Sequence, residues 1–418
     1  MLGSRSLRLT GLALTALLLA ACSGGNGSPT SGPGAHGSPT TPPLKVASVA
    51  PLTLSGTTPL VVTFRQPLAT NSTLPTLDPS IPGSWVRSGS TATFTPAQAY
   101  PPSTKFQLRL VRRSGGVAKT IARPVSDPGS LRFAGQILAR LHYLPLRTKA
   151  AQPTTPADEA AAVFTPPKGR FVWRYTGTPT GIVHAWKPGL ANVVLRGAVI
   201  AFQHQWHLTQ DGAIGPATWK KLLLADTAGS MDPEPYSYVS ANLYDRPQLL
   251  QVWVDGHTAL SSPVNGGVTG APTPLGTYPI FLRYVATTMQ GTNPDGTKYK
   301  DKGVPWVNYF SGGSAVHGFQ RASYGFPQSV GCLELPPTTA KKVYDLIDYG
   351  TLVNVTGPFV PTSSATPSPP ATATPKSGKP KPHGSPKPHG SPKPSSSGAT
   401  TTTPSPTASA ASTHKPKH

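Results

Sequence analysis

The sequence predicts a mainly β protein of several domains, with one small α-helical module among them. Its 418 residues leave room for two or three domains of roughly 100–200 residues each. Proline (51) and glycine (42) are frequent, and only 12% of the residues are charged. This composition is typical of short strands joined by turns and flexible segments rather than of a helical bundle. Several runs alternate apolar and polar residues, as strands with one buried face do.

Residues 1–22 have the features of an export signal. Arg5 and Arg8 precede an apolar stretch over 9–21, which is too short for a membrane span of about 20 residues. This stretch runs into Leu-Ala-Ala-Cys and resembles the bacterial lipobox, in which cleavage leaves the cysteine, here Cys22, as a lipid-bearing first residue. The alternative is an ordinary signal peptide cut at an A-x-A-like site, which leaves Cys22 unexplained. We therefore expect a lipoprotein on the outer face of the cytoplasmic membrane, facing the cell wall.

A linker and a β-rich segment follow. Residues 23–44 are rich in Gly, Ser and Pro and contain no core-forming run. Within 45–126, short β-prone runs at 60–64, 92–96 and 106–111 are separated by turn-rich stretches, which predicts a β-sandwich of about 80 residues. The stretches PLVVTFRQPL and GSTATFTPAQAYPPSTKFQLRL resemble bacterial Ig-like domains. Because no catalytic constellation occurs here, we expect a spacer or stabilising module.

The segment 127–228 has helical spacing. The run 131–141 predicts one helix, and the run 192–208 predicts another. In the second run, apolar side chains recur on one helical face. They are Leu195, Val199, Phe202 and Trp206. Pro216 suits the first turn of a third, short helix.

This helical segment resembles the peptidoglycan-binding-domain-like repeat. The matching residues are Ala198, Val199, Phe202, Gln203, Asp211, Gly212, Gly215, Pro216, Thr218 and Trp219. The resemblance implies binding to glycan strands; the alternative is a helical module that only packs against the next domain. The stretch 147–190 is longer than the inter-helix loop of that family, and we expect a β-hairpin or a lid there.

Residues 232–358 read as a mostly β domain. Leu250, Val252 and Val254 alternate along the chain before the Asp255-Gly256 turn, which predicts a hairpin. One helix is expected over 337–348, capped by Thr338 or Thr339.

Residues 359–418 form a tail rich in Pro, Lys, His, Ser and Thr, with KPHGSP twice in tandem and no acidic residue. Such a segment buries no core and is expected to be disordered. It is either a cationic arm for anionic wall polymers or lipid head groups, or a plain spacer. A metal site on its histidines is the weaker reading, because they lack fixed ligand spacing.

The chemistry of the domain over 232–358 centres on one thiol. If lipidation occupies Cys22, Cys332 is the remaining cysteine, and it is either a small buried hydrophobic residue or a reactive nucleophile. A thiolate attacks acyl carbon far better than a thiol, and an imidazole within hydrogen-bond reach can take the proton. His317 is the candidate imidazole. Gly331, directly before the thiol, allows close approach of the backbone to a substrate.

The region 238–356 resembles the catalytic domain of L,D-transpeptidases, the YkuD-type fold. That family carries HG or HS on one strand and then [ST]-H-G-C after a loop. Here His317 matches the family histidine, Ser329 the hydroxyl residue, Gly331 the glycine and Cys332 the nucleophile. The segment TPLGTYPI over 273–280 matches an upstream TPxGxF element. The chain departs from the pattern in Val330, in Glu334 and in a short His317–Ser329 spacing.

The resemblance implies a role for each matching residue. Cys332 is the nucleophile and His317 the general base and then acid. Backbone N–H groups of Gly331 and Cys332 are the expected oxyanion donors, and a carbonyl near Gly318 is expected to orient His317. Ser329 either supports the site by hydrogen bonding or is a turn residue.

Three aromatic residues, Tyr309, Trp306 and Tyr324, are candidates for lining the donor groove, with core or loop packing as the alternative. The expected reaction forms 3→3 cross-links between peptidoglycan stem peptides, and the family also reacts with carbapenems. The alternatives are an L,D-carboxypeptidase on the same substrate and a non-catalytic wall-binding lipoprotein. No HExxH, Walker or dinucleotide-binding element occurs in a suitable context, so we expect no metal or cofactor and no nucleic-acid partner.

Overall fold

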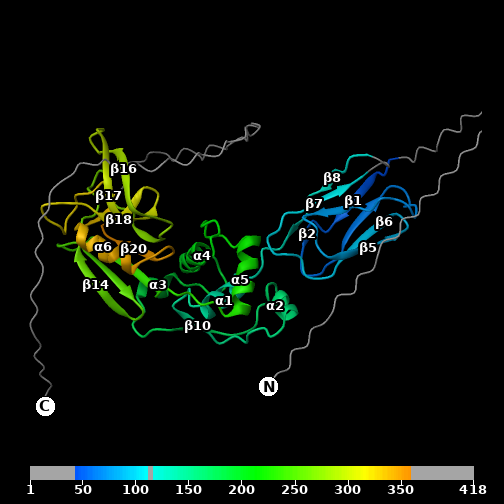
Figure 1. Ribbon diagram of the computed structural model, residues 1–418, viewed down its shortest axis with the longest axis horizontal. Coiled ribbons are helices and arrows are strands. Elements are labelled where there is room, and N and C mark those ends of the chain that lie inside the picture. The colour runs from blue at the N-terminus through cyan, green and yellow to red at the C-terminus, as the bar shows by residue number, and fades with distance from the viewer. Residues whose placement is uncertain (1–42, 112–115, 359–418) are drawn as a thin grey trace, which may run out of the picture. The chain divides into compact units, whose positions relative to one another are not determined.

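The computed structural model describes residues 43–111 and 116–358 (Figure 1). Within these ranges strands outnumber helices, and the buried hydrophobic residues form four clusters. The prediction of a mainly β, multidomain fold is therefore confirmed. The predicted signal peptide with Cys22, nearly all of the linker and the tail lie outside the described residues.

The first domain consists of short strands around one core. Its strands are β1 (Val46–Ala50), β2 (Thr53–Leu54), β3 (Leu60–Phe64), β4 (Thr76–Asp78), β5 (Gly83–Ser88), β6 (Thr91–Pro96), β7 (Gln107–Leu110), β8 (Lys119–Ala122) and β9 (Val125–Ser126). They pair as β1-β3-β6-β5, as β4-β7-β8 and as β2-β9. The core of this domain contains side chains from both sheets. The first sheet contributes Leu60, Val62 and Phe94, and the second contributes Leu108, with Phe106 next to it. The strands expected at 60–64, 92–96 and 106–111 are thus observed, while the Ig-like identity stays a prediction.

The second domain is helical. Its elements are α1 (Leu131–Arg140), β10 (Leu146–Thr148), α2 (Pro156–Ala162), β11 (Phe171–Trp173), α3 (Thr180–Ala185), α4 (Val193–Gln205) and α5 (Pro216–Ala228). The side chain of Asn192 caps α4 by accepting a hydrogen bond from the Leu195 N–H at 3.0 Å. Pro216 begins α5, and Gly229 ends it in the left-handed conformation. The three helices expected from the sequence are therefore confirmed.

The long stretch between α1 and α4 belongs to the core of this domain. β10 and β11 pair antiparallel, so the expected β pairing is present. Phe171 packs edge-on against Trp186, with ring centroids 5.2 Å apart, and both contact the helical core. The stretch contributes no residue to the cavity around Cys332 described below. These apolar side chains are used in packing, and the lid considered for this stretch stays a prediction.

The third domain contains two sheets and one helix. Its elements are β12 (Ser237–Asn242), β13 (Leu249–Val254), β14 (His257–Pro263), β15 (Gly276–Pro279), β16 (Leu282–Thr292), β17 (Lys298–Ser311), β18 (Ser314–Gly318), β19 (Leu333–Leu335), α6 (Pro337–Leu346) and β20 (Leu352–Thr356). One sheet has the order β14-β13-β12-β20-β15 and the other β16-β17-β18-β19. In Figure 1 the two long strands β16 and β17 form a ribbon that extends from the rest of this domain.

Local sequence explains two of these elements. Leu250 and Val252 of β13 are fully buried, and Asp255 and Gly256 both take positive φ in the turn to β14. The predicted hairpin is therefore confirmed. The predicted cap of α6 is wrong: the N-cap position is Pro336, and no side chain bonds to the first turn. Pro337 instead begins the helix with a fixed φ and no N–H to satisfy.

Candidate active site

The candidate site lies on two neighbouring strands. β18 and β19 run parallel, and His317 is directly opposite Glu334 in their register. Val316 and Leu333 point into the core between the two sheets. Because side chains alternate along a strand, His317 and Glu334 point to the opposite face. Cys332 is the residue directly before β19, so the same alternation places its side chain on the face of His317 and Glu334. The strand pattern therefore brings a thiol, an imidazole and a carboxylate together.

The turn before Cys332 is held in place from two sides. The hydroxyl of Ser329, which is fully buried, donates to the Cys332 carbonyl oxygen at 2.7 Å. The hydroxyl of Thr273, from the segment matched to TPxGxF, donates to the same oxygen at 3.2 Å. Gly331 has φ +96°, a conformation that side chains other than glycine rarely adopt. In this structure the Ser329 hydroxyl is thus used to hold the turn.

His317 is buried and has a defined orientation. Its Nδ1 lies 3.1 Å from the Gly318 carbonyl oxygen, which can only accept a hydrogen bond. Nδ1 therefore carries the proton, and Nε2 is left as the acceptor. Burial lowers the pKa of His317 below its ordinary value, although the Gly318 carbonyl and Glu334 act in the opposite direction. A side chain at Gly318 would meet Pro305 and Pro337 at 3.1 Å, so this carbonyl is held close to the ring by packing.

Cys332 is partly exposed and lies in a poorly solvated position. Burial raises its pKa to about 11, and a hydrogen bond with the backbone of Ala315 offsets this only in part. Its Sγ lies 3.9 Å from the Gly313 carbonyl oxygen, a contact that suits an S–H donor. At neutral pH the site therefore holds a thiol and a neutral imidazole rather than a thiolate–imidazolium pair. Attack on an acyl carbon requires the thiol proton to be transferred to His317.

Both groups open into one cavity of about 250 Å³, which we call the Cys332 cavity. It is lined by Met289, Asn293, Tyr299, Asp301, Val304, His317, Phe319, Arg321, Val330, Cys332 and Glu334. The ribbon formed by β16 and β17 supplies one side of it, and the loop that follows β18 supplies another. The sulfur is therefore accessible to a small peptide segment, as a nucleophile must be.

Glu334, a departure from the family pattern, has an ion-pair partner. The Nε and Nη2 groups of Arg321 each donate to one carboxylate oxygen of Glu334 at 2.9 Å. The guanidinium lies over the ring of Phe319, 4.5 Å from its centroid. Sequence reasoning missed Arg321, together with Asp301, Tyr299 and Phe319. The one signal in the sequence was Glu334 itself. An acidic residue at a motif position usually held by Arg or Asn indicates that a basic partner is needed.

The three predicted substrate-binding aromatics lie elsewhere. Trp306 packs on Tyr344 of α6, with ring centroids 5.5 Å apart, and contacts the core between the sheets. Tyr324 is used to fix its own loop, because its hydroxyl donates to the Phe319 carbonyl at 2.7 Å. Both placements correct the expectation of a groove-lining role. Tyr309 packs against the same small cluster as Cys332 and lies near it, but it does not line the cavity.

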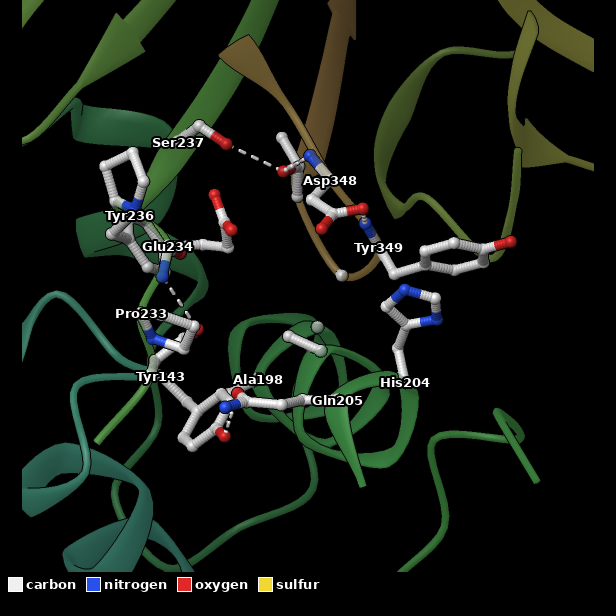
Figure 2. Close-up of a pocket in the computed structure, with 16 residues that line it drawn as sticks. Tyr143, Ala198, His204, Gln205, Pro233, Glu234, Tyr236, Ser237, Asp348 and Tyr349 are labelled. Atoms are coloured by element: carbon white, nitrogen blue, oxygen red, sulfur yellow. Dashed lines mark hydrogen bonds between the residues drawn. The ribbon is translucent and has the colours of Figure 1, made fainter. Parts of the chain in front are cut away.

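A second cavity of about 230 Å³, the His204 cavity, lies between α4 and the loops around Asp232 and Asp348 (Figure 2). Figure 2 shows the His204 ring facing Tyr349, and their centroids are 3.9 Å apart. Burial lowers the pKa of His204 and raises the pKa of Asp232 to about 7. Asp348 is paired with Arg283. No cysteine lines this cavity, so it offers no nucleophile of the kind found at Cys332.

Among the described residues, no group of three or more His, Cys, Asp or Glu side chains is arranged to hold a metal ion. Within the same ranges, every helix is too short or too polar to cross a bilayer.

Comparison with known proteins identifies one segment. The family model described as YkuD, L,D-transpeptidase catalytic domain, matches residues 237–355, which confirms the resemblance for the third domain. No curated protein matches the chain.

Several solved structures are similar. The catalytic domain of an L,D-transpeptidase from E. faecium is 26% identical, covers 30% of this chain and 100% of its own, and has a TM-score of 0.27. An L,D-transpeptidase from Mycobacterium smegmatis is 15% identical over 75% of this chain and 100% of its own, with a TM-score of 0.26. L,D-transpeptidase 3 from Mycobacterium tuberculosis is 14% identical over 75% and 98%, with a TM-score of 0.27.

Proposed function

We propose that this protein is a cysteine L,D-transpeptidase that forms 3→3 cross-links between peptidoglycan stem peptides. Residues 237–355 match the catalytic domain of that family. The observation that carries the proposal is the placement of Cys332 and His317 on one face of two adjacent strands, both lining one accessible cavity. The ring of His317 is held with Nε2 unprotonated, which is the state a general base needs.

The first half-reaction acylates the enzyme. Nε2 of His317 takes the thiol proton while Sγ of Cys332 attacks the carbonyl carbon of the third residue, a diamino acid, of a donor tetrapeptide. The backbone N–H groups of Gly331 and Cys332 are the proposed donors to the oxyanion. When the tetrahedral intermediate collapses, the C–N bond to D-alanine breaks and the imidazolium gives its proton to the leaving amine. The product is a thioester on Cys332.

The second half-reaction releases the peptide. The side-chain amine of a diamino acid on an acceptor stem attacks the thioester carbonyl and gives a proton to His317. The C–S bond then breaks, and the sulfur takes the proton back. If water attacked instead, the same thioester would give a tripeptide, and the enzyme would be an L,D-carboxypeptidase. The chemistry on Cys332 is identical in both cases, so the identity of the attacking group decides between them.

The rest of the chain suggests where this reaction takes place. We propose that a lipid on Cys22 anchors the protein to the outer face of the cytoplasmic membrane and that the first domain holds the enzyme toward the wall. The helical domain, through its likeness to peptidoglycan-binding repeats, is proposed to bind glycan strands. The basic tail is proposed to contact anionic wall polymers.

The test uses the full chain and disaccharide tetrapeptides as substrate. We expect a 3→3 dimer with loss of D-alanine, and we expect a thioester or a carbapenem adduct on Cys332 by intact-mass spectrometry. Cys332→Ala should abolish both product and adduct. A tripeptide without dimer would assign the carboxypeptidase alternative. Undiminished dimer from Cys332→Ala would contradict the mechanism. Neither product nor adduct from the wild type would favour a non-catalytic wall-binding protein.

A further inference from the structure

The guanidinium of Arg321 belongs to the same cavity as the candidate nucleophile. Glu334 holds it through two hydrogen bonds of 2.9 Å, and the ring of Phe319 supports its face at 4.5 Å. Glu334 is itself buried, and a buried carboxylate is costly unless it is paired. Removing either partner therefore leaves a charge without compensation, so the pair is expected to be persistent. Arg321 thus has one preferred geometry at the edge of the Cys332 cavity.

One edge of this guanidinium is not used within the protein. Nε and Nη2 donate to Glu334, and Nη2 also makes a long contact of 3.4 Å with the Gln328 carbonyl oxygen. Nη1 has no hydrogen-bond partner among the described residues. The side chain is 30% exposed and lines the Cys332 cavity. An unpaired N–H edge on a cavity-lining guanidinium that is held in one geometry is suited to bind an anion or a carbonyl oxygen.

The cavity offers a ligand carboxylate a single cationic group. Arg321 is the one Lys or Arg among the residues that line it, and the other formally charged lining residues are Asp301 and Glu334. Glu334 is already paired with Arg321, so a second carboxylate from a ligand would find a donor at Nη1. A stem peptide brings such a group next to the bond that breaks, because its terminal residue carries a free carboxylate.

We propose that Arg321 binds the terminal carboxylate of the donor stem peptide and thereby selects donors with a free C-terminus. Glu334 acts as a positioning residue that aims the guanidinium. This inference rests on the proposed function, because it concerns the donor of that same reaction. It also gives a physical role to the acidic residue in the motif. The carboxylate of Glu334 on β19 holds the guanidinium of Arg321, which comes from the loop after β18, at the site.

The experiment compares two donors that differ at one group, a tetrapeptide with a free C-terminal carboxylate and the same peptide with a C-terminal amide. With wild type we expect the lower KM for the free acid. Arg321→Gln should raise the KM for the free acid by about tenfold, the usual scale for a lost charge-assisted hydrogen bond, and leave the KM for the amide nearly unchanged. Glu334→Gln should cause a smaller rise, because the cation stays but is less well held.

The matched control is Arg109→Gln, which removes an exposed Arg–Asp pair in the first domain and should change neither KM. Arg321→Lys keeps the charge without the forked geometry and should give an intermediate preference. If Arg321→Gln does not fold, Arg321→Lys provides the test in its place. Alkylation of Cys332 by iodoacetamide checks that the thiol remains accessible in each variant.

The outcomes separate this inference from the proposed function. An equal loss with both donors, or an unchanged preference for the free acid in the Arg321 variants, overturns the carboxylate-binding role while wild-type acylation still supports the enzyme. A wild type that forms no acyl-enzyme with either donor overturns the proposed function itself.

Discussion

The Cys332 cavity and the His204 cavity resemble each other in several respects. Their volumes are about 250 and 230 Å³, and each contains a histidine whose pKa is lowered by burial. Both also contain carboxylates. They differ in what faces the imidazole: His317 shares its face of the strands with a thiol, whereas His204 stacks on the ring of Tyr349.

This difference shows that a cavity with shifted pKa values does not by itself identify an active site. In the His204 cavity, desolvation, with smaller contributions from the charges of Glu234 and Asp348, raises the pKa of Asp232 to about 7. A catalytic role also requires a nucleophile and a ring nitrogen that can accept its proton. In the Cys332 cavity the Gly318 carbonyl fixes the tautomer that provides this nitrogen. The His204 cavity is instead a packing junction between α4 and the third domain.

The largest expected effect separates the two histidines. His317→Ala should lower the rate of acyl-enzyme formation by about 10²–10⁴-fold, the usual contribution of a general base. The matched change His204→Ala removes a ring of the same kind from the other cavity and should leave that rate within about twofold, since only packing is lost. The measurement is the burst of D-alanine release or carbapenem adduct formation. Equal losses in both variants would remove the distinction between the cavities.

The pH dependence of the thiol is a second way to test the comparison. With a pKa of about 11, Cys332 is almost entirely protonated near neutral pH. Its alkylation by iodoacetamide should therefore rise about tenfold per pH unit between pH 7 and 9, because the thiolate fraction grows by that factor below the pKa. Asp232→Asn changes a group that titrates near pH 7 in the other cavity and should not alter this profile. A rate that is flat from pH 6 to 9 would instead indicate a preformed thiolate–imidazolium pair.

The smallest expected effect concerns the turn before the nucleophile. Gly331→Ala should lower the free energy of unfolding by about 1–2 kcal/mol, because φ +96° is strained for any residue with a Cβ. Gly177→Ala has a similar backbone requirement, φ +76° with open space around it, far from the thiol in sequence. Both variants should lose similar stability in chemical denaturation, but only Gly331→Ala should also slow thiol acylation. Equal acylation by the two would mean that this turn does not position Cys332.

Much of the site could be predicted from the sequence because its rules are local. The residue types in this segment offer an imidazole as the base for a thiol, and the glycine before the thiol allows close approach of the backbone to a substrate. The family likeness then assigns these residues to one reaction. The sequence could not decide the roles of Trp306 and Tyr324. An aromatic residue near a motif looks the same in the sequence whether it lines a groove or packs inside the domain.

The sequence by itself determined the mainly β character, the helices of the second domain and the pairing of a histidine with a cysteine in one domain. The tertiary structure decided the rest: the partnership of Arg321 with Glu334, the tautomer of His317 and the burial that keeps the thiol protonated. Each of these depends on residues brought together by the parallel register of β18 and β19 and by the loop between them. Desolvation and ion pairing are properties of a three-dimensional neighbourhood, and no local pattern along the chain records them.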